Sequence, residues 1–133
     1  MLPMTPIPHL ACTWSDVVQC CPIHPHQLYL AQRDAGISPQ PQSFFTIPLN
    51  RVHHLPAVVF VRGADGRPEY EPVDWSAYSE LMDVPTGTRE WYRMLAERNR
   101  RGAAFVGVPH LMIQGQIDIS DLAILDWSDP TGT

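Results

Sequence analysis

Two stretches of the chain repeat apolar residues at intervals of three and four, the spacing that places side chains on one face of a helix. The first predicts a helix at about residues 25–35, which ends before Gly36 because glycine readily closes a helix. The second predicts a helix at about residues 88–101, with Thr88 as its N-cap. The apolar positions are Leu28 and Ala31 in the first stretch and Trp91, Met94 and Leu95 in the second.

Runs of β-branched and apolar residues predict short strands between and after these helices. The clearest is a hairpin over residues 57–73, whose return strand contains Pro68 and Pro72. Proline lacks a backbone N–H, so this strand is expected at the edge of a sheet. Further expected elements are strands at 103–108 and 111–119 and a short helical turn at 120–127. The pattern predicts the α+β class, with short antiparallel strands and two main helices.

Length and composition predict one domain over residues 1–133. The hydrophobic content of 44% is sufficient for a packed core. Fourteen prolines favour short elements and ordered loops. Within this domain we expect residues 1–12 to be an extended proline-rich arm and residues 128–133 to be a frayed tail.

Charge and cysteine content narrow the classes of function. The net charge of −5 argues against a protein that binds nucleic acid by electrostatics alone. It does not exclude a nuclease, because a metal ion and a local basic patch can neutralise the phosphate charge. No apolar run is long enough for a membrane span, and residues 1–8 lack the basic segment of a secretory signal. Three cysteines do not form a disulfide framework. We therefore expect a cytoplasmic protein without a membrane partner.

Four of the six histidines fall in two close pairs, His24 with His26 and His53 with His54. Imidazole is a common ligand for zinc and related metals, and it is also suited to proton transfer near neutral pH. Two pairs about thirty residues apart could converge on one site. The alternative is that each histidine is a surface or hydrogen-bonded residue without a catalytic role.

Residues 43–55, Ser-Phe-Phe-Thr-Ile-Pro-Leu-Asn-Arg-Val-His-His-Leu, resemble the second half of the HNH (ββα-metal) endonuclease motif. The string His24-Pro-His26-Gln-Leu, followed by a predicted helix and Gly-Ile, resembles the start of toxin-type members. The resemblance covers roughly residues 20–60. The chain departs from the motif at Asn50, where cysteine is common, and at Ala57, where a second helix ligand is usual. A degenerate relative is therefore also compatible with it.

The resemblance implies a metal-dependent nuclease that hydrolyses phosphodiester bonds in DNA. His24 or His26 would act as the catalytic general base, and His53 and His54 would hold a divalent metal: zinc, magnesium, manganese or nickel. Independently of the resemblance, three arginines fall on a broad face of the second predicted helix and could contact phosphate: Arg93, Arg100 and Arg101. The alternative is a solvated helix face, in which Glu90 and Glu97 offset the positive charge. Enzymatic activity is thus one of two interpretations.

The alternative is a non-enzymatic, acidic protein–protein interaction module, such as a phage accessory, inhibitor or immunity-type protein. Its basis is the negative charge, the hairpin at 57–73 and a group of aromatic residues that suits interfaces. The aromatic residues are Trp75, Tyr78, Trp91 and Tyr92, which could also belong to the core. This interpretation predicts a protein partner and a contiguous apolar or acidic patch.

Overall fold

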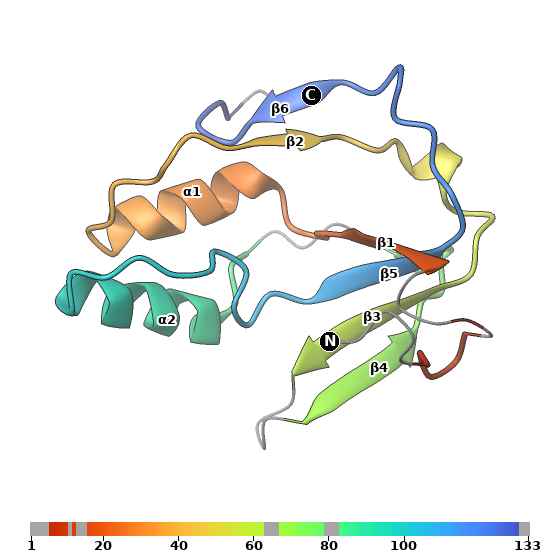
Figure 1. Ribbon diagram of the computed structural model, residues 1–133, viewed down its shortest axis with the longest axis horizontal. Coiled ribbons are helices and arrows are strands. Elements are labelled where there is room, and N and C mark those ends of the chain that lie inside the picture. The colour runs from red at the N-terminus through yellow and green to blue at the C-terminus, as the bar shows by residue number, and fades with distance from the viewer. Residues whose placement is uncertain (1–5, 11, 13–15, 63–66, 79–82, 131–133) are drawn as a thin grey trace. The chain divides into compact units, whose positions relative to one another are not determined.

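The structure is a computed structural model that describes residues 6–10, 12, 16–62, 67–78 and 83–130 (Figure 1). Two helices and short antiparallel strands in two sheets confirm the predicted α+β class. In chain order the elements are β1 (Val17–Cys20), α1 (Pro25–Asp34), β2 (Ser43–Phe45), the 3-10 helix η2 (Leu49–Arg51), β3 (Ala57–Arg62), β4 (Pro68–Pro72), α2 (Thr86–Glu97), β5 (His110–Gln114) and β6 (Ile124–Asp126).

The chain divides into two compact units, each assembled from three segments. The sheet unit comprises residues 1–22, 47–79 and 109–122, and the helix unit comprises residues 23–46, 80–108 and 123–133. Neither helix in the described part of the chain is long and apolar enough to cross a membrane.

The sheet unit contains a four-stranded antiparallel sheet in the order β1-β5-β3-β4. Strands β3 and β4 form the predicted hairpin, with Val58 opposite Pro72 and Arg62 opposite Pro68. Strand β4 lies at the sheet edge, as its two prolines predict. The central strand β5 supplies the buried residues Leu111, Met112 and Ile113.

Part of the predicted N-terminal arm belongs to the core of the sheet unit. Ile7 is buried and packs in a cluster with Val58, Phe60 and Met112. The backbone turns immediately afterwards, because the N–H of Leu10 donates to the Ile7 carbonyl at 3.2 Å. The described part of the arm is therefore a packed turn. Residues 1–5 and 11 of the arm, and residues 131–133 of the predicted tail, lie outside the described residues.

The helix unit packs α1 between α2 and the two-stranded ribbon of β2 and β6 (Figure 1). Helix α1 ends as its sequence predicts. Gly36 adopts φ +93°, its N–H donates to the Arg33 carbonyl, and the N–H of Ile37 donates to the Gln32 carbonyl. These two bonds define a Schellman motif. The largest fully buried side chain of the unit is Trp127, whose indole N–H donates to the Gln40 carbonyl at 2.9 Å.

Helix α2 differs from the prediction at both ends, because it spans Thr86–Glu97 rather than 88–101. Thr88 is not its N-cap, a position that Pro85 occupies. Thr88 is instead fully buried in the first turn, and its hydroxyl donates to the Val106 carbonyl at 2.7 Å. The helix ends early because Asn99 adopts the left-handed conformation, with φ +49°.

The C-terminal third contains the other wrong predictions. Residues 103–108 form turns instead of a strand, and the strand expected at 111–119 ends at Gln114. The helical turn expected at 120–127 is replaced by strand β6, which pairs with β2. The helical turn was expected because it would bury Leu122, Leu125 and Trp127. Residues 124–126 form a strand instead because they pair with β2, which is distant in the chain.

Candidate functional sites

His24 caps helix α1 instead of projecting freely. Its Nδ1 accepts a hydrogen bond from the backbone N–H of His26 at 3.1 Å, and Pro25 occupies the first helical position. An imidazole nitrogen that accepts a hydrogen bond carries no proton, so neutral His24 has its proton on Nε2. In this state His24 has no lone pair left for a metal or for proton abstraction. The capping bond thus gives His24 a structural role in the first turn.

His26 is held through its other ring nitrogen. A carbonyl oxygen can only accept, so His26 Nδ1 donates to the Trp127 carbonyl, at 2.9 Å. The ring also stacks on Tyr29, with 5.7 Å between centroids and 18° between planes. This arrangement leaves the Nε2 lone pair of neutral His26 as its reactive atom. Of the first histidine pair, His26 is the better placed for acid–base chemistry.

His53 and His54 lie in a turn between η2 and β3, and both are exposed. His53 Nδ1 donates to the Leu49 carbonyl at 3.2 Å, and the two rings meet edge to face at 6.1 Å. The resemblance to the HNH motif implies an α-helix that carries a metal ligand here. In the structure the neighbouring elements are a single 3-10 turn and a strand, so the geometry of this stretch departs from that motif.

The two histidine pairs belong to different units, His24 and His26 to the helix unit and His53 and His54 to the sheet unit. Among the residues that the structure describes, no three His, Cys, Asp or Glu side chains are grouped so that they could hold a metal. Burial, together with the neighbouring Cys21, raises the pKa of the Cys20 thiol to about 11. Cys20 is therefore a neutral thiol at physiological pH. The metal site stays a prediction.

The three predicted phosphate-binding arginines are all exposed, Arg93 on α2 and the other two just after it. Arg100 and Arg101 line a small pocket in the helix unit, whereas Arg93 is not among its lining residues. Arg93 therefore does not share this pocket with the other two arginines.

The four predicted aromatic anchors all make contacts within the chain. Tyr92 is fully buried, and its hydroxyl donates to the Ala104 carbonyl. The indole N–H of Trp91 donates to the Ala103 carbonyl and that of Trp75 to the Leu55 carbonyl, each at 2.9 Å. Tyr78 is half-buried and packs edge to face on Trp75. Tyr92 is therefore a core residue, whereas Trp75, Tyr78 and Trp91 are partly buried and held by these contacts.

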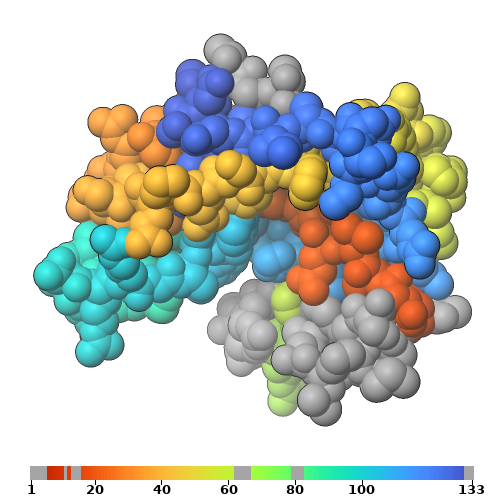
Figure 2. All heavy atoms as spheres, turned by 45° about the horizontal axis from the view of Figure 1, so that its top comes forward, coloured from red at the N-terminus to blue at the C-terminus, as the bar shows by residue number. Residues whose placement is uncertain are grey.

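The most exposed apolar pair among the described residues of the helix unit was not identified from the sequence. Phe45 and Ile124 lie opposite each other in the β2–β6 ribbon and are 49% and 65% exposed. Their neighbours Phe44 and Leu125 form the next pair and point to the other face, where Leu125 is 1% exposed. Figure 2 looks onto the surface where the yellow β2 segment and the blue β6 segment run side by side. We call the outward side of this ribbon the ribbon face.

An acidic residue lies on the ribbon face next to the apolar pair. Asp126 is exposed and opposite Ser43, two positions from Ile124 and hence on the same side of the ribbon. The backbone N–H and the hydroxyl of Ser128 donate to its carboxylate at 2.9 and 2.8 Å, and these bonds lower the pKa of Asp126. Asp126 is therefore fully ionised at neutral pH.

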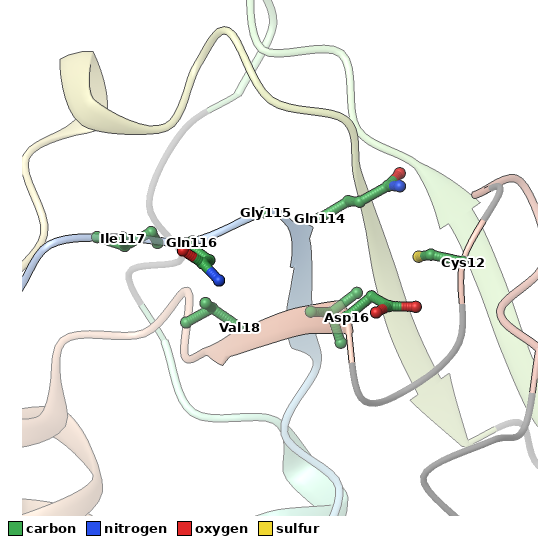
Figure 3. Close-up of a pocket in the computed structure, with 8 residues that line it drawn as sticks. Cys12, Asp16, Val18, Gln114, Gly115, Gln116 and Ile117 are labelled. Atoms are coloured by element: carbon green, nitrogen blue, oxygen red, sulfur yellow. The ribbon is translucent and has the colours of Figure 1, made fainter.

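A wide cleft of about 760 Å³ opens in the sheet unit beside β1 and β5 (Figure 3). Its lining includes Cys12, Asp16, Gln114 and Gln116. The Cys12 side chain is directed toward Asp16 in Figure 3. Partial burial and the negative charge of Asp16 raise the pKa of the Cys12 thiol. A thiol held in its protonated form is a weak nucleophile, so Cys12 is not activated for covalent chemistry.

Comparisons of the chain with protein-family models, curated proteins and solved structures found no significant match.

Proposed function

We propose that this protein is a non-enzymatic protein–protein interaction module that binds its partner through the ribbon face. The exposed cross-strand pair of Phe45 and Ile124 is the observation that carries the proposal. Single exposed apolar residues are common on protein surfaces, but two large ones that are directly paired form a continuous apolar surface. A ribbon of two strands also has two outer edges that can receive a further strand.

The charge of the ribbon face favours a basic partner. Asp126 contributes an ionised carboxylate beside the apolar pair, and the whole chain has a net charge of −5. A second copy of the chain would bring like charges together, which opposes self-association at this face. The partner is therefore a different protein that presents an apolar side chain next to a lysine or arginine.

The expected contribution of the apolar pair follows from its exposure. Complete burial of an isoleucine or phenylalanine side chain contributes about 1.5–3 kcal/mol. Since Ile124 is 65% exposed, its docking would contribute about 1–2 kcal/mol to the free energy of binding. Loss of that side chain should weaken binding roughly tenfold, which is the range of a moderate interface residue.

Photocrosslinking in the native host tests the proposal. A benzophenone amino acid replaces Ile124 in one protein and, as a matched control, the exposed Leu30 of α1 in another. We expect one partner to be captured from position 124 and not from position 30, and its complex with the purified protein to be weakened by Ile124→Ser and Phe45→Ser. Equal capture from both positions, or a captured protein that is a second copy of this chain, would contradict the proposal.

The proposed site of action is the reducing cytosol, which suits the cysteines that form no disulfide in the structure, Cys12, Cys20 and Cys21. The nuclease interpretation, with DNA as partner and a divalent metal as cofactor, stays a prediction that a cleavage assay can test. Its strongest structural support is His26, whose fixed ring leaves Nε2 available as a base.

A further inference from the structure

A small pocket of about 70 Å³ lies in the helix unit where the two helices end. Its lining residues include the apolar Leu95 and Trp127 and the polar Gln32, Arg100 and Arg101. This volume accommodates a group of a few heavy atoms and excludes a nucleotide or a sugar. The lining therefore suits a small polar group with an apolar contact on one side.

Gln32 is the unusual member of the lining. It is only 8% exposed on the buried face of α1, beside Leu28 and Ala31. Its backbone carbonyl accepts the capping bond from Ile37, but its side-chain amide makes no hydrogen bond among the residues that the structure describes. A buried amide with two donors and one acceptor is normally paired. An unpaired amide in a pocket lining indicates that a bound group completes its hydrogen bonds.

The two arginines are placed at the pocket by the end of α2. The N–H of Arg100 donates to the Leu95 carbonyl at 2.8 Å, and the N–H of Asn99 donates to the Ala96 carbonyl at 3.1 Å. This Schellman motif turns the chain at Asn99 so that Arg100 and Arg101 both line the pocket. Within the described ranges neither guanidinium has an ion-pair partner, so both are available to an anion.

We propose that this pocket binds a single carboxylate group, from a free carboxylic acid or from a peptide. A guanidinium and a carboxylate are both planar and form two parallel hydrogen bonds, and the Gln32 amide can donate a further one. The carbonyl ends of α1 and α2 oppose a highly charged anion, which favours a monoanionic carboxylate over phosphate. This proposal is independent of the ribbon face and requires no partner protein.

An NMR titration of the full chain tests the proposal. N-acetylglycine supplies one carboxylate next to an amide, and N-acetylglycinamide is the same molecule without the charge. We expect saturable shifts of the Gln32 side-chain NH₂ and of the Arg100 and Arg101 Nε–H signals with N-acetylglycine only. A longer peptide with a free C-terminus and a small dicarboxylic acid distinguish the two sources of the carboxylate.

Variants decide whether the pocket itself is responsible. We expect Arg101→Gln and Gln32→Leu to raise the dissociation constant about tenfold. Arg93→Gln removes the same charge from α2 outside the pocket and should leave the constant unchanged. If Gln32→Leu impairs folding, Arg100→Gln takes its place. The proposal is overturned by equal binding of the amide, by tighter binding of inorganic phosphate, by an equal effect of Arg93→Gln, or by the absence of saturation.

Discussion

The buried hydroxyl of Thr88 gives the sharpest prediction about the helix unit. Replacement by valine keeps the shape of the side chain but removes the bond to the Val106 carbonyl. A buried acceptor that loses its donor costs about 1–3 kcal/mol. Val106 itself is 40% exposed, so water can partly rehydrate its carbonyl. We therefore expect Thr88→Val to lower the free energy of unfolding by about 1–2 kcal/mol.

A second substitution separates this role from the helix-capping role that the sequence suggests. Aspartate is as good an N-cap as threonine, so Thr88→Asp would be harmless if Thr88 were the cap. In the buried site it places a carboxylate beside a carbonyl oxygen and should cost about 3 kcal/mol or more. Urea denaturation, followed by circular dichroism, measures the free energy of unfolding of both variants. Thr86 is exposed, so the control variant Thr86→Val should unfold with a free energy within about 0.5 kcal/mol of the wild-type value. A Thr88→Asp protein as stable as the wild type would show that Thr88 acts as the helix cap and not as a buried donor.

Three further predictions concern backbone conformation, thiol reactivity and metal content. Gly36→Ala should lower the free energy of unfolding by about 1 kcal/mol, because φ is +93° at this position. Gly87→Ala in α2 is the control: an added Cβ meets no atom within 4 Å, so this variant should be as stable as the wild type or more stable. The same urea assay measures both variants. The Cys20 thiol should react with iodoacetamide at a rate that rises about tenfold per pH unit up to about pH 11, because its pKa is raised. Peptide mass spectrometry follows this reaction. A reaction rate that levels off near pH 9 would show that Cys20 has the pKa of an ordinary thiol. If the protein is an interaction module, it should not cleave plasmid DNA with magnesium, manganese, zinc or nickel, and the purified protein should contain no stoichiometric metal. Bound metal that is lost in a His54→Ala variant would favour the nuclease instead.

Local chemistry made part of the fold predictable from the sequence. Gly36 closes α1 because it can adopt a positive φ, and the prolines of β4 place that strand at an edge because they lack donors. Both are properties of single residues and their immediate neighbours. The predicted hairpin follows for the same reason, since its two strands are adjacent in the chain.

Pairing between distant segments was not predictable. Strand β6 has only three residues, and its partner β2 is near residue 44, so no local pattern identifies it. The ribbon face was missed for this reason: Phe45 and Ile124 become a pair only once the register is known. The same holds for Thr88, whose hydroxyl partner at Val106 is on another segment.

The histidines show the corresponding limit for function. Their clustering in the sequence suggested one shared site, but the hydrogen bonds of each ring depend on the local backbone. His24 uses its Nδ1 as a cap, and His26 and His53 use theirs as donors to carbonyls. Residue spacing alone does not reveal which nitrogen is occupied.

The affinity of the captured partner for variants of the ribbon face decides whether this face is the binding site. Calorimetric titration would compare the wild type with Ile124→Ser, Asp126→Asn and Leu30→Ser. The account predicts binding about tenfold weaker for Ile124→Ser, a smaller loss with reduced salt dependence for Asp126→Asn, and no change for Leu30→Ser. Wild-type affinity in Ile124→Ser, or an equal loss in Leu30→Ser, would contradict it.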